Sequence, residues 1–244
     1  MTHPRNRSLP RWICNVVIAL AAGLAAGTGV AQNAPREGSA ADASAPAGGA
    51  AAGGASEQNM PPDQLVKTVS NEVLDIIRKD KDIQSGNQNK VIGLVQEKVL
   101  PHFDFVRMTA LAVGQGWRKA TPEQQKQLSE EFRTLLVRTY SSGLSAYRNQ
   151  TIDFKPFRAD PGASEVIVRS EVKQPSAQPV TIDYRMEKTP QGWKVYDVSI
   201  GGVSLVTTYR DSFGQEVRQS GVDGLIKSLA DKNRQLEQSQ SAQR

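Results

Sequence analysis

The hydrophobic residues of this chain change their spacing at Thr151, and that change limits the folds open to it. Before Thr151 they recur every three or four residues, as on one side of an amphipathic helix; after it they alternate with polar residues, as in a strand. The alternating positions predicted to share a face are Ile152, Phe154, Val166, Val168, Val172, Val180, Ile182, Tyr184 and Met186. One dry and one wet face is typical of an antiparallel meander whose helices cover a single side.

Helical patterns flank the strands on both sides. The four that precede them run from about Asp63 to Ile77, Asn87 to Leu100, Phe103 to Val113 and Thr121 to Tyr147. Pro101 stops the second, and Thr121 followed by Pro122 is a helix start. The pattern predicts an α+β domain over residues 61–238, with about six helices on one face of a small curved antiparallel four-stranded sheet.

The stretch from Gly192 to Phe213 joins a strand to a helix. Strict alternation puts Lys194, Tyr196, Val198 and Ile200 on one face, and Trp193, Val195, Asp197 and Ser199 on the other. Gly201 and Gly202 allow the backbone to reverse. The apolar positions that follow have a helical period: Val203, Val206, Phe213 and Val217. The stretch is therefore predicted to fold a helix back onto the sheet, and Gly221 is predicted to separate it from a last helix.

The first 60 residues are predicted to lie outside the folded domain. Residues 1–31 combine three arginines, a short apolar run and a small-residue cleavage site, which is typical of a signal peptide. Residues 32–60 are rich in Ala, Gly and Pro and have little to bury, so we expect a disordered spacer. Residues 239–244 are expected to be a frayed tail.

Export is also consistent with the charge and the cysteine content. The leader holds three arginines and no acid, so its removal lowers the formal net charge from +5 to +2. Without a dense basic block, we expect no nucleic-acid partner. Cys14 lies in the leader, so the mature chain has no thiol and folds on its core alone. We expect a monomer in the periplasm.

The sequence offers little catalytic chemistry. The mature chain has one histidine, His102, and no cysteine, which excludes the usual zinc sites within one chain. It has no nucleophile elbow and no phosphate-binding loop. Asp197, opposite Tyr196, is expected to be a solvated or ion-paired residue. We therefore predict neither an enzyme, nor a metal site, nor a cofactor.

The apolar positions allow two interpretations. Periodicity alone favours an ordinary packed core between sheet and helices. Several tyrosines at positions predicted to face inward favour a cavity to a small degree. A buried phenol needs a hydrogen-bond partner, and tyrosine suits the entrance of a cavity that water reaches. The residues by themselves leave both open.

Several motifs resemble the MlaC family, also called the toluene-tolerance auxiliary component. The resemblance is carried by WKVYDVSIGGVSLVTTYRDSF from Trp193, by GVDGL from Gly221, by PHFDF from Pro101, by the Trp117 region and by TPEQ from Thr121. It extends over roughly Pro61 to Gln238 and includes the family pattern W-x-V-Y-D-V-x-x-x-G-V-S-L-x-x-x-Y-R. Thr208 departs from it, since many members have Asn there; an outward polar position tolerates that exchange.

The resemblance implies a periplasmic carrier that shuttles diacyl phospholipids and so maintains the lipid asymmetry of the outer membrane. Its implied partners are an outer-membrane lipoprotein–porin complex and an inner-membrane ABC transporter with an MCE-domain protein. The bound phospholipid would be cargo in an internal apolar cavity between sheet and helices. The alternatives are a periplasmic adaptor with a solid core and a hydrolase that uses carboxylates.

With the family's cavity in mind, we predict its lining in this chain. The predicted lining residues are Leu136, Tyr140, Leu144, Val168, Ile182, Tyr184, Tyr196, Val198, Val203 and Val206. Tyr147 and Arg210 are predicted for the rim, where the head group would lie.

Overall fold

The structure is a computed structural model that describes residues 59–145, 147, 150–174 and 178–241. The predicted signal peptide and nearly all of the predicted spacer lie outside the described residues. Within the described part, no helix combines the length and the apolar character needed to cross a membrane.

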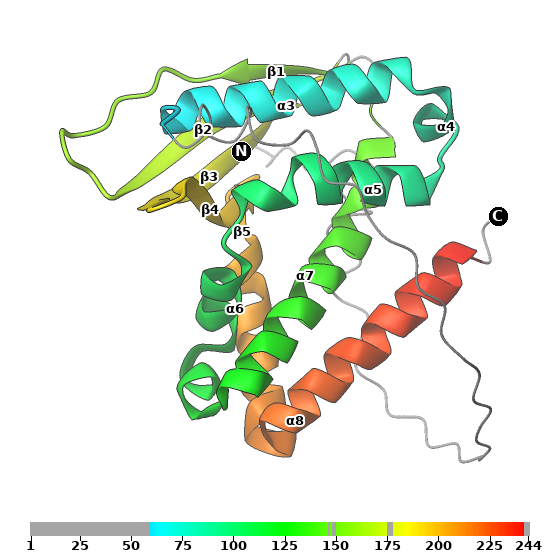
Figure 1. Cartoon of the computed structure of the whole chain (residues 1–244). Helices are drawn as coiled ribbons and strands as arrows, with labels where there is room; N and C mark the ends of the chain where they lie inside the picture. The colour runs from blue at the N-terminus through cyan, green and yellow to red at the C-terminus, as the bar shows by residue number, and fades with distance from the viewer. Residues whose placement is uncertain (1–58, 146, 148–149, 175–177, 242–244) are drawn as a thin grey trace, which may run out of the picture.

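The described residues form six α-helices and two short 3-10 helices. The α-helices are α3 (Pro62–Lys79), α4 (Lys81–Gln84), α5 (Gln88–Lys98), α6 (Phe105–Val113), α7 (Pro122–Ser145) and α8 (Leu205–Ser241), and the 3-10 helices are η1 (Leu100–His102) and η2 (Gly114–Lys119). The short helix α4 was not predicted; the Asp80 side chain caps it by accepting hydrogen bonds from two backbone N–H groups. In Figure 1, α3 crosses in front of the sheet and α5 runs below it, while α7 and α8 diverge like the arms of a V.

Five antiparallel strands form the sheet, one more than predicted. They are β1 (Thr151–Phe154), β2 (Glu165–Lys173), β3 (Val180–Thr189), β4 (Gly192–Ile200) and β5 (Val203–Ser204), paired in chain order. The extra strand, β5, has only two residues, and it pairs with the end of β4 after a turn at Gly201 and Gly202. Both glycines have positive φ, 59° and 85°. Val203, predicted to start the helix, therefore lies in a strand.

The register confirms the predicted dry face of β1, β2 and β3. Val166 pairs with Met186 and Val168 with Tyr184. Val166, Val168 and Met186 are buried. The residues between them, such as Arg169 and Arg185, are exposed. Helix α3 covers this face with Leu65 and Val66, as α+β packing requires.

A β-bulge interrupts the alternation in β4. Arg185 pairs with Asp197, but Met186 pairs with Val195, so Tyr196 is left without a partner in β3. A bulge adds one residue to one strand and shifts which side chains reach each face. As a result Val195 and Val198, three residues apart, both pack in the sheet's apolar interior. The predicted faces of Val195 and Tyr196 are therefore wrong, and that of Val198 is right.

Helix α8 begins directly after β5 and is capped by Asp197 and Ser204. Asp197 Oδ1 accepts a hydrogen bond from the Val206 N–H at 3.2 Å, and Oδ2 accepts one from Ser204 Oγ at 2.7 Å. Ser204 Oγ in turn accepts one from the Thr207 N–H at 3.0 Å. Asp197 is buried rather than solvated, although Arg185 Nε lies 3.9 Å away as an ion-pair partner. The Asp and Ser of the family pattern thus act together at one helix start.

Gly221 bends α8, as the sequence predicts. Its φ of 72° and ψ of −176° are not helical, so the helix consists of two straight parts on either side. The second part runs to Ser241, three residues beyond the predicted end at Gln238.

Buried side chains form three apolar clusters. The helical cluster joins α6, α7 and α8 and includes Met108, Ala112, Leu128, Phe132, Leu136, Tyr196, Val206, Phe213, Leu225 and Leu229. The sheet cluster lies between the dry face and α3 and comprises Leu65, Val66, Val166, Val168, Met186, Val195 and Val198. The α3–α5 cluster comprises Val73, Leu74, Ile77, Ile83, Val91, Leu94 and Tyr147.

Candidate functional site

The three clusters adjoin one another through shared side chains. Phe103, just before α6, packs against both the helical cluster and the sheet cluster. Val69 on α3 packs against both the sheet cluster and the α3–α5 cluster. Neither residue was among the predicted cavity residues, and the signal that could have marked Phe103 is its place in the PHFDF motif. The layer between sheet and helices is thus lined by all three clusters.

The predicted cavity residues are distributed over these clusters. Leu136, Tyr140, Tyr196 and Val206 lie in or against the helical cluster, Val168, Ile182, Tyr184 and Val198 in or against the sheet cluster, and Leu144 against the α3–α5 cluster. Four of these residues are only partly buried: Tyr140, Leu144, Ile182 and Tyr184. Val203 is 56% exposed and belongs to none of the clusters. The structure therefore gives no support to Val203 as a lining residue.

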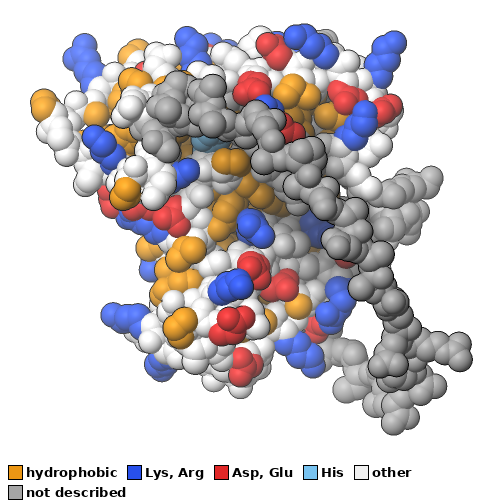
Figure 2. All heavy atoms as spheres, viewed as in Figure 1, with side chains coloured by type: hydrophobic (Ala, Val, Ile, Leu, Met, Phe, Trp, Pro, Cys, Tyr) orange, Lys and Arg blue, Asp and Glu red, His pale blue; other side chains and the backbone are white. Residues whose placement is uncertain are grey.

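The molecular surface shows apolar atoms where these layers approach each other. In Figure 2, orange side chains gather in a recess between the upper part of the molecule, with α3 and α5, and the lower part, with α6, α7 and α8. Each of the three clusters includes partly buried hydrophobic residues, which water can still reach.

The bulge takes Tyr196 out of the sheet cluster and into the helical cluster. The Arg107 guanidinium, from α6, lies 3.8 Å from the centre of the Tyr196 ring. The Tyr196 hydroxyl donates a hydrogen bond to Glu165 Oε2 at 3.0 Å. Burial and the Glu165 carboxylate both raise the pKa of Tyr196. Tyr196 thus joins α6 to the sheet instead of lining the dry face.

Arg107 completes this junction with two ion pairs. Its Nη2 lies 2.6 Å from Glu165 Oε1 on β2, and its Nη1 contacts Glu187 Oε2 on β3. Hydrogen bonds from Arg107 and then from Tyr196 lower the pKa of Glu165. Sequence patterns could not have found this group, since its members are up to 89 residues apart, from Arg107 to Tyr196.

The two predicted rim residues have different surroundings. Tyr147 is only 8% exposed, and its hydroxyl accepts a hydrogen bond from Arg78 Nη2 at 2.8 Å. The Arg78 guanidinium also lies 5.5 Å from the Tyr147 ring centre. Arg210 is exposed on α8, with its side chain near Gly114. The cation beside Tyr147 is thus Arg78, which the sequence analysis did not name.

Several buried hydroxyls lie on the walls of the layer. Burial raises the pKa of Tyr140 and that of Tyr209, its neighbour on α8. Burial likewise raises the pKa of Tyr184, while the hydroxyls of Ser170 and Ser70 act in the opposite direction. The interior is therefore apolar with a few polar points, and among the described residues no group of three or more His, Cys, Asp or Glu side chains could hold a metal ion.

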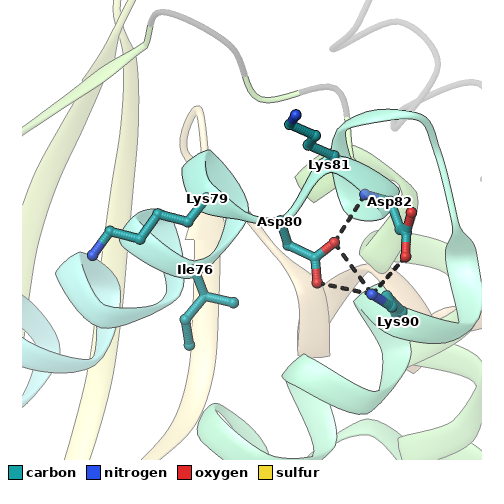
Figure 3. Close-up of a pocket in the computed structure, with 6 residues that line it drawn as sticks. All are labelled: Ile76, Lys79, Asp80, Lys81, Asp82 and Lys90. Carbon is teal, nitrogen blue, oxygen red and sulfur yellow. Dashed lines mark hydrogen bonds and ion pairs between the residues drawn. The ribbon is translucent and has the colours of Figure 1, made fainter.

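Two hollows on the described surface lie elsewhere. One, of about 490 Å³, is lined by Ile76, Lys79, Asp80, Lys81, Asp82 and Lys90. Figure 3 shows Lys90 held between the two carboxylates, and the contacts are 3.2 Å to Asp80 and 2.6 Å to Asp82. The other, of about 390 Å³, is lined by Arg158, Ala159, Asp160, Ala163, Glu165, Val166 and Ile167. Neither contains a predicted cavity residue, so the internal cavity stays a prediction.

The fold and the site together define an α+β protein with an apolar layer between its meander sheet and its helices. Side chains of the three clusters form this layer. The family model "MlaC protein" matches residues 67–231 of this chain, which is more than half of it. The chain belongs to the MlaC family, as its motifs predict.

Named relatives agree with this assignment. The toluene tolerance protein ttg2D of Pseudomonas putida is 27% identical over 164 residues, which are 66% of this chain and 75% of that protein. The intermembrane phospholipid transport system binding protein MlaC of Haemophilus influenzae is 23% identical over 158 residues, 61% of this chain and 73% of that protein.

A solved structure is more similar still. The phospholipid-binding protein of Ralstonia solanacearum, determined in complex with a phospholipid, is 44% identical to this chain. The TM-score is 0.69, and the match covers 73% of this chain and 99% of that one.

Proposed function

We propose that this protein is a phospholipid carrier of the periplasm. The observation that carries the proposal is the 44% identity to a protein solved with a bound phospholipid, over 99% of that protein's length. The apolar interior supports it, because the three clusters adjoin one another and some of their residues remain partly exposed. The bound lipid is cargo, and no chemical step on it is proposed.

The energetics explain what such a carrier must provide. Removing about thirty acyl methylenes from water is worth on the order of 25 kcal/mol, at about 0.8 kcal/mol each. The same chains gain almost nothing when they come from a bilayer. The carrier interior must therefore be about as apolar as a membrane, and docking partners must give the transfer its direction.

We place the carrier between two membrane complexes. The donor and acceptor proposed are an outer-membrane lipoprotein–porin complex and an inner-membrane ABC transporter that holds an MCE-domain protein. The names of the two curated relatives, one for toluene tolerance and one for intermembrane phospholipid transport, support this role. Its purpose would be to maintain the lipid asymmetry of the outer membrane.

Lipid identification is the direct test of the carrier proposal. The full chain is expressed with export, purified without detergent and measured by native mass spectrometry. We expect a mass increase that matches one phospholipid, which extraction and fragmentation then identify. Protein that is uniformly free of lipid, and that takes up none from vesicles, would instead favour the adaptor with a solid core.

A matched pair of variants locates the binding surface. Ile182 on β3 faces the sheet cluster, whereas Ile167 on β2 lies one residue from Val166 and Val168 and so on the other face. Ile182→Trp fills the dry face and should reduce bound phospholipid severalfold. Ile167→Trp adds the same bulk outside and should leave the lipid content unchanged. Equal lipid content in the two variants would place the ligand elsewhere, with circular dichroism to show that both fold.

The partners are tested separately from lipid binding. Labelled phospholipid should move from the loaded carrier to a membrane-embedded complex with an MCE-domain protein faster than to plain vesicles. Equal rates to the complex and to plain vesicles would contradict the proposed docking while leaving the carrier role intact.

A further inference from the structure

One serine on the dry face has a buried hydroxyl. Ser170, on β2, is 1% exposed, and among the described residues its Oγ atom has no partner within hydrogen-bonding distance. It pairs with Ile182 on β3 and with Phe154 on β1, so it lies in the middle of the apolar surface. An unsatisfied hydroxyl in such a place is costly, since water no longer bonds to it. An apolar residue there would pack without that cost.

Two other hydroxyls come from the neighbouring elements. Tyr184 lies two residues from Ile182 on β3, a diagonal neighbour of Ser170 within reach of a long aromatic side chain. Ser70 is on the buried stripe of α3, with Val66 and Val73 on either side. Both serine hydroxyls lie close enough to the Tyr184 phenol to influence its pKa. Ser70, Ser170 and Tyr184 therefore form one hydroxyl cluster between sheet and helix.

The surroundings limit what this hydroxyl cluster can bind. The dry face around it carries the apolar side chains of Val168, Ile182 and Val198, and the sheet cluster to which they belong consists of hydrophobic residues in the described part of the chain. A phosphate buried there would have no cation to balance it and would be strongly disfavoured. A neutral oxygen that only accepts hydrogen bonds suits a donor hydroxyl in an apolar wall.

We propose that the hydroxyl cluster of Ser70, Ser170 and Tyr184 binds a carbonyl oxygen of a fatty-acyl ester, with Ser170 as donor. This inference rests on the proposed function and adds a chemical preference to it. The acyl chains lie against apolar side chains that accept any chain, whereas the two esters are the neutral polar groups that adjoin the chains. The cluster therefore favours ester-linked over ether-linked phospholipids.

A competition between two lipids tests this preference. Wild-type protein is equilibrated with vesicles that contain equal amounts of a diester and a diether phosphatidylglycerol with chains of the same length. Native mass spectrometry then gives the ratio of the two bound lipids. We expect Ser170→Ala to lower the ratio of diester to diether by roughly threefold to tenfold relative to wild type, the effect of one hydrogen bond. Tyr184→Phe, which keeps the ring, should lower it in the same direction.

Ser129→Ala is the matched control. Ser129 is also a buried serine, but its Oγ donates to the Gln125 carbonyl on α7, away from the sheet. This variant should keep the wild-type ratio. If Ser170→Ala and Tyr184→Phe both leave the ratio unchanged, the inference is overturned and the carrier role stands. A buried water that satisfies Ser170 would give this result. If wild type binds neither lipid, the proposed function fails and the inference fails with it.

Discussion

Asp197 is the residue on which the start of α8 depends. Its two carboxylate oxygens accept hydrogen bonds from the Val206 N–H and the Ser204 hydroxyl, in a position where it is 5% exposed. No water can take over both bonds in such a place. The family pattern thus has an Asp at this position for a structural reason, which is to hold a helix end against a strand.

Asp197→Ala should reduce the free energy of unfolding by about 2 to 3 kcal/mol, because a buried acceptor and the helix cap that it provides are lost together. Urea unfolding followed by circular dichroism measures this change. Asp183→Ala is the control, since Asp183 is a partly exposed strand residue whose Oδ2 lies 3.9 Å from Arg169 Nε. Its loss should cost less than about 1 kcal/mol. Equal effects from the two variants would contradict the capping role.

Glu165 gives the junction with α6 a dependence on pH. Its pKa is lowered in the folded protein by the Arg107 and Tyr196 hydrogen bonds. A lowered pKa means that the interaction stabilises the fold above the carboxyl's unfolded pKa and is lost as the pH falls through the folded one.

The stability difference between wild type and Glu165→Gln should therefore be largest near neutral pH and shrink in acid. Urea midpoints at about pH 7 and about pH 3 give the comparison. Glu171→Gln, on the same strand, is a control for loss of one carboxylate, since Glu171 pairs with Lys155 and not with Arg107. A difference that is the same at both pH values would show that Glu165 acts through packing and not through charge.

At the scale of elements, the bend in α8 depends on Gly221. With φ at 72° and ψ at −176°, this residue has a conformation that is almost exclusive to glycine. A Cβ built there meets nothing within 4 Å, so a side chain would strain the backbone without clashing. The bend lets the second part of α8 return along α7, where Leu225 and Leu229 enter the helical cluster.

Gly221→Ala should destabilise the protein by about 1 to 3 kcal/mol through backbone strain alone. Gly93→Ala is the matched control, because Gly93 is exposed inside α5 and also has open space around its Cβ position. That change should stabilise by about 0.5 to 1 kcal/mol, as alanine is the better helix former. Thermal unfolding shows whether each substitution stabilises or destabilises the protein. Stabilisation by both substitutions would mean that α8 straightens at no cost.

At the scale of the whole molecule, the tyrosines are buried or partly buried. The pKa is raised by burial for Tyr140, Tyr184, Tyr196 and Tyr209, four of the five tyrosines of the chain. A raised pKa means that their contribution to stability is complete below the unfolded value and is lost as the pH rises through the folded one.

The phenolate absorbance of the native protein at about pH 10.5 should therefore be well below that of the urea-unfolded protein, in which tyrosines ionise near pH 10. Because protein atoms bury the four phenols, lipid-loaded and lipid-free protein should both show the lag. Superimposable titrations of native and unfolded protein would mean that the layer between sheet and helices is open to water.

The sequence determined the parts of this fold that depend on neighbours along the chain. Alternation in β2 and β3 and the three-to-four spacing in the helices depend on backbone geometry alone, so Val168, Ile182 and Leu136 could be assigned to the interior. The family could also be recognised from the sequence, because the motif residues around Gly192 to Phe213 keep the spacing of the family pattern. The fifth strand was missed because two residues show no period.

Only the tertiary structure decided which of these inward residues meet. Because β4 has one extra residue, Tyr196 lies against Arg107 and not on the dry face. The alternation of residues in the sequence does not predict a bulge. Val203 was counted with the helix and is exposed in a short strand. The group of Ser70, Ser170 and Tyr184 unites three elements. Its existence depends on register and helix placement, which are set by contacts between residues distant in the sequence and not by local pattern.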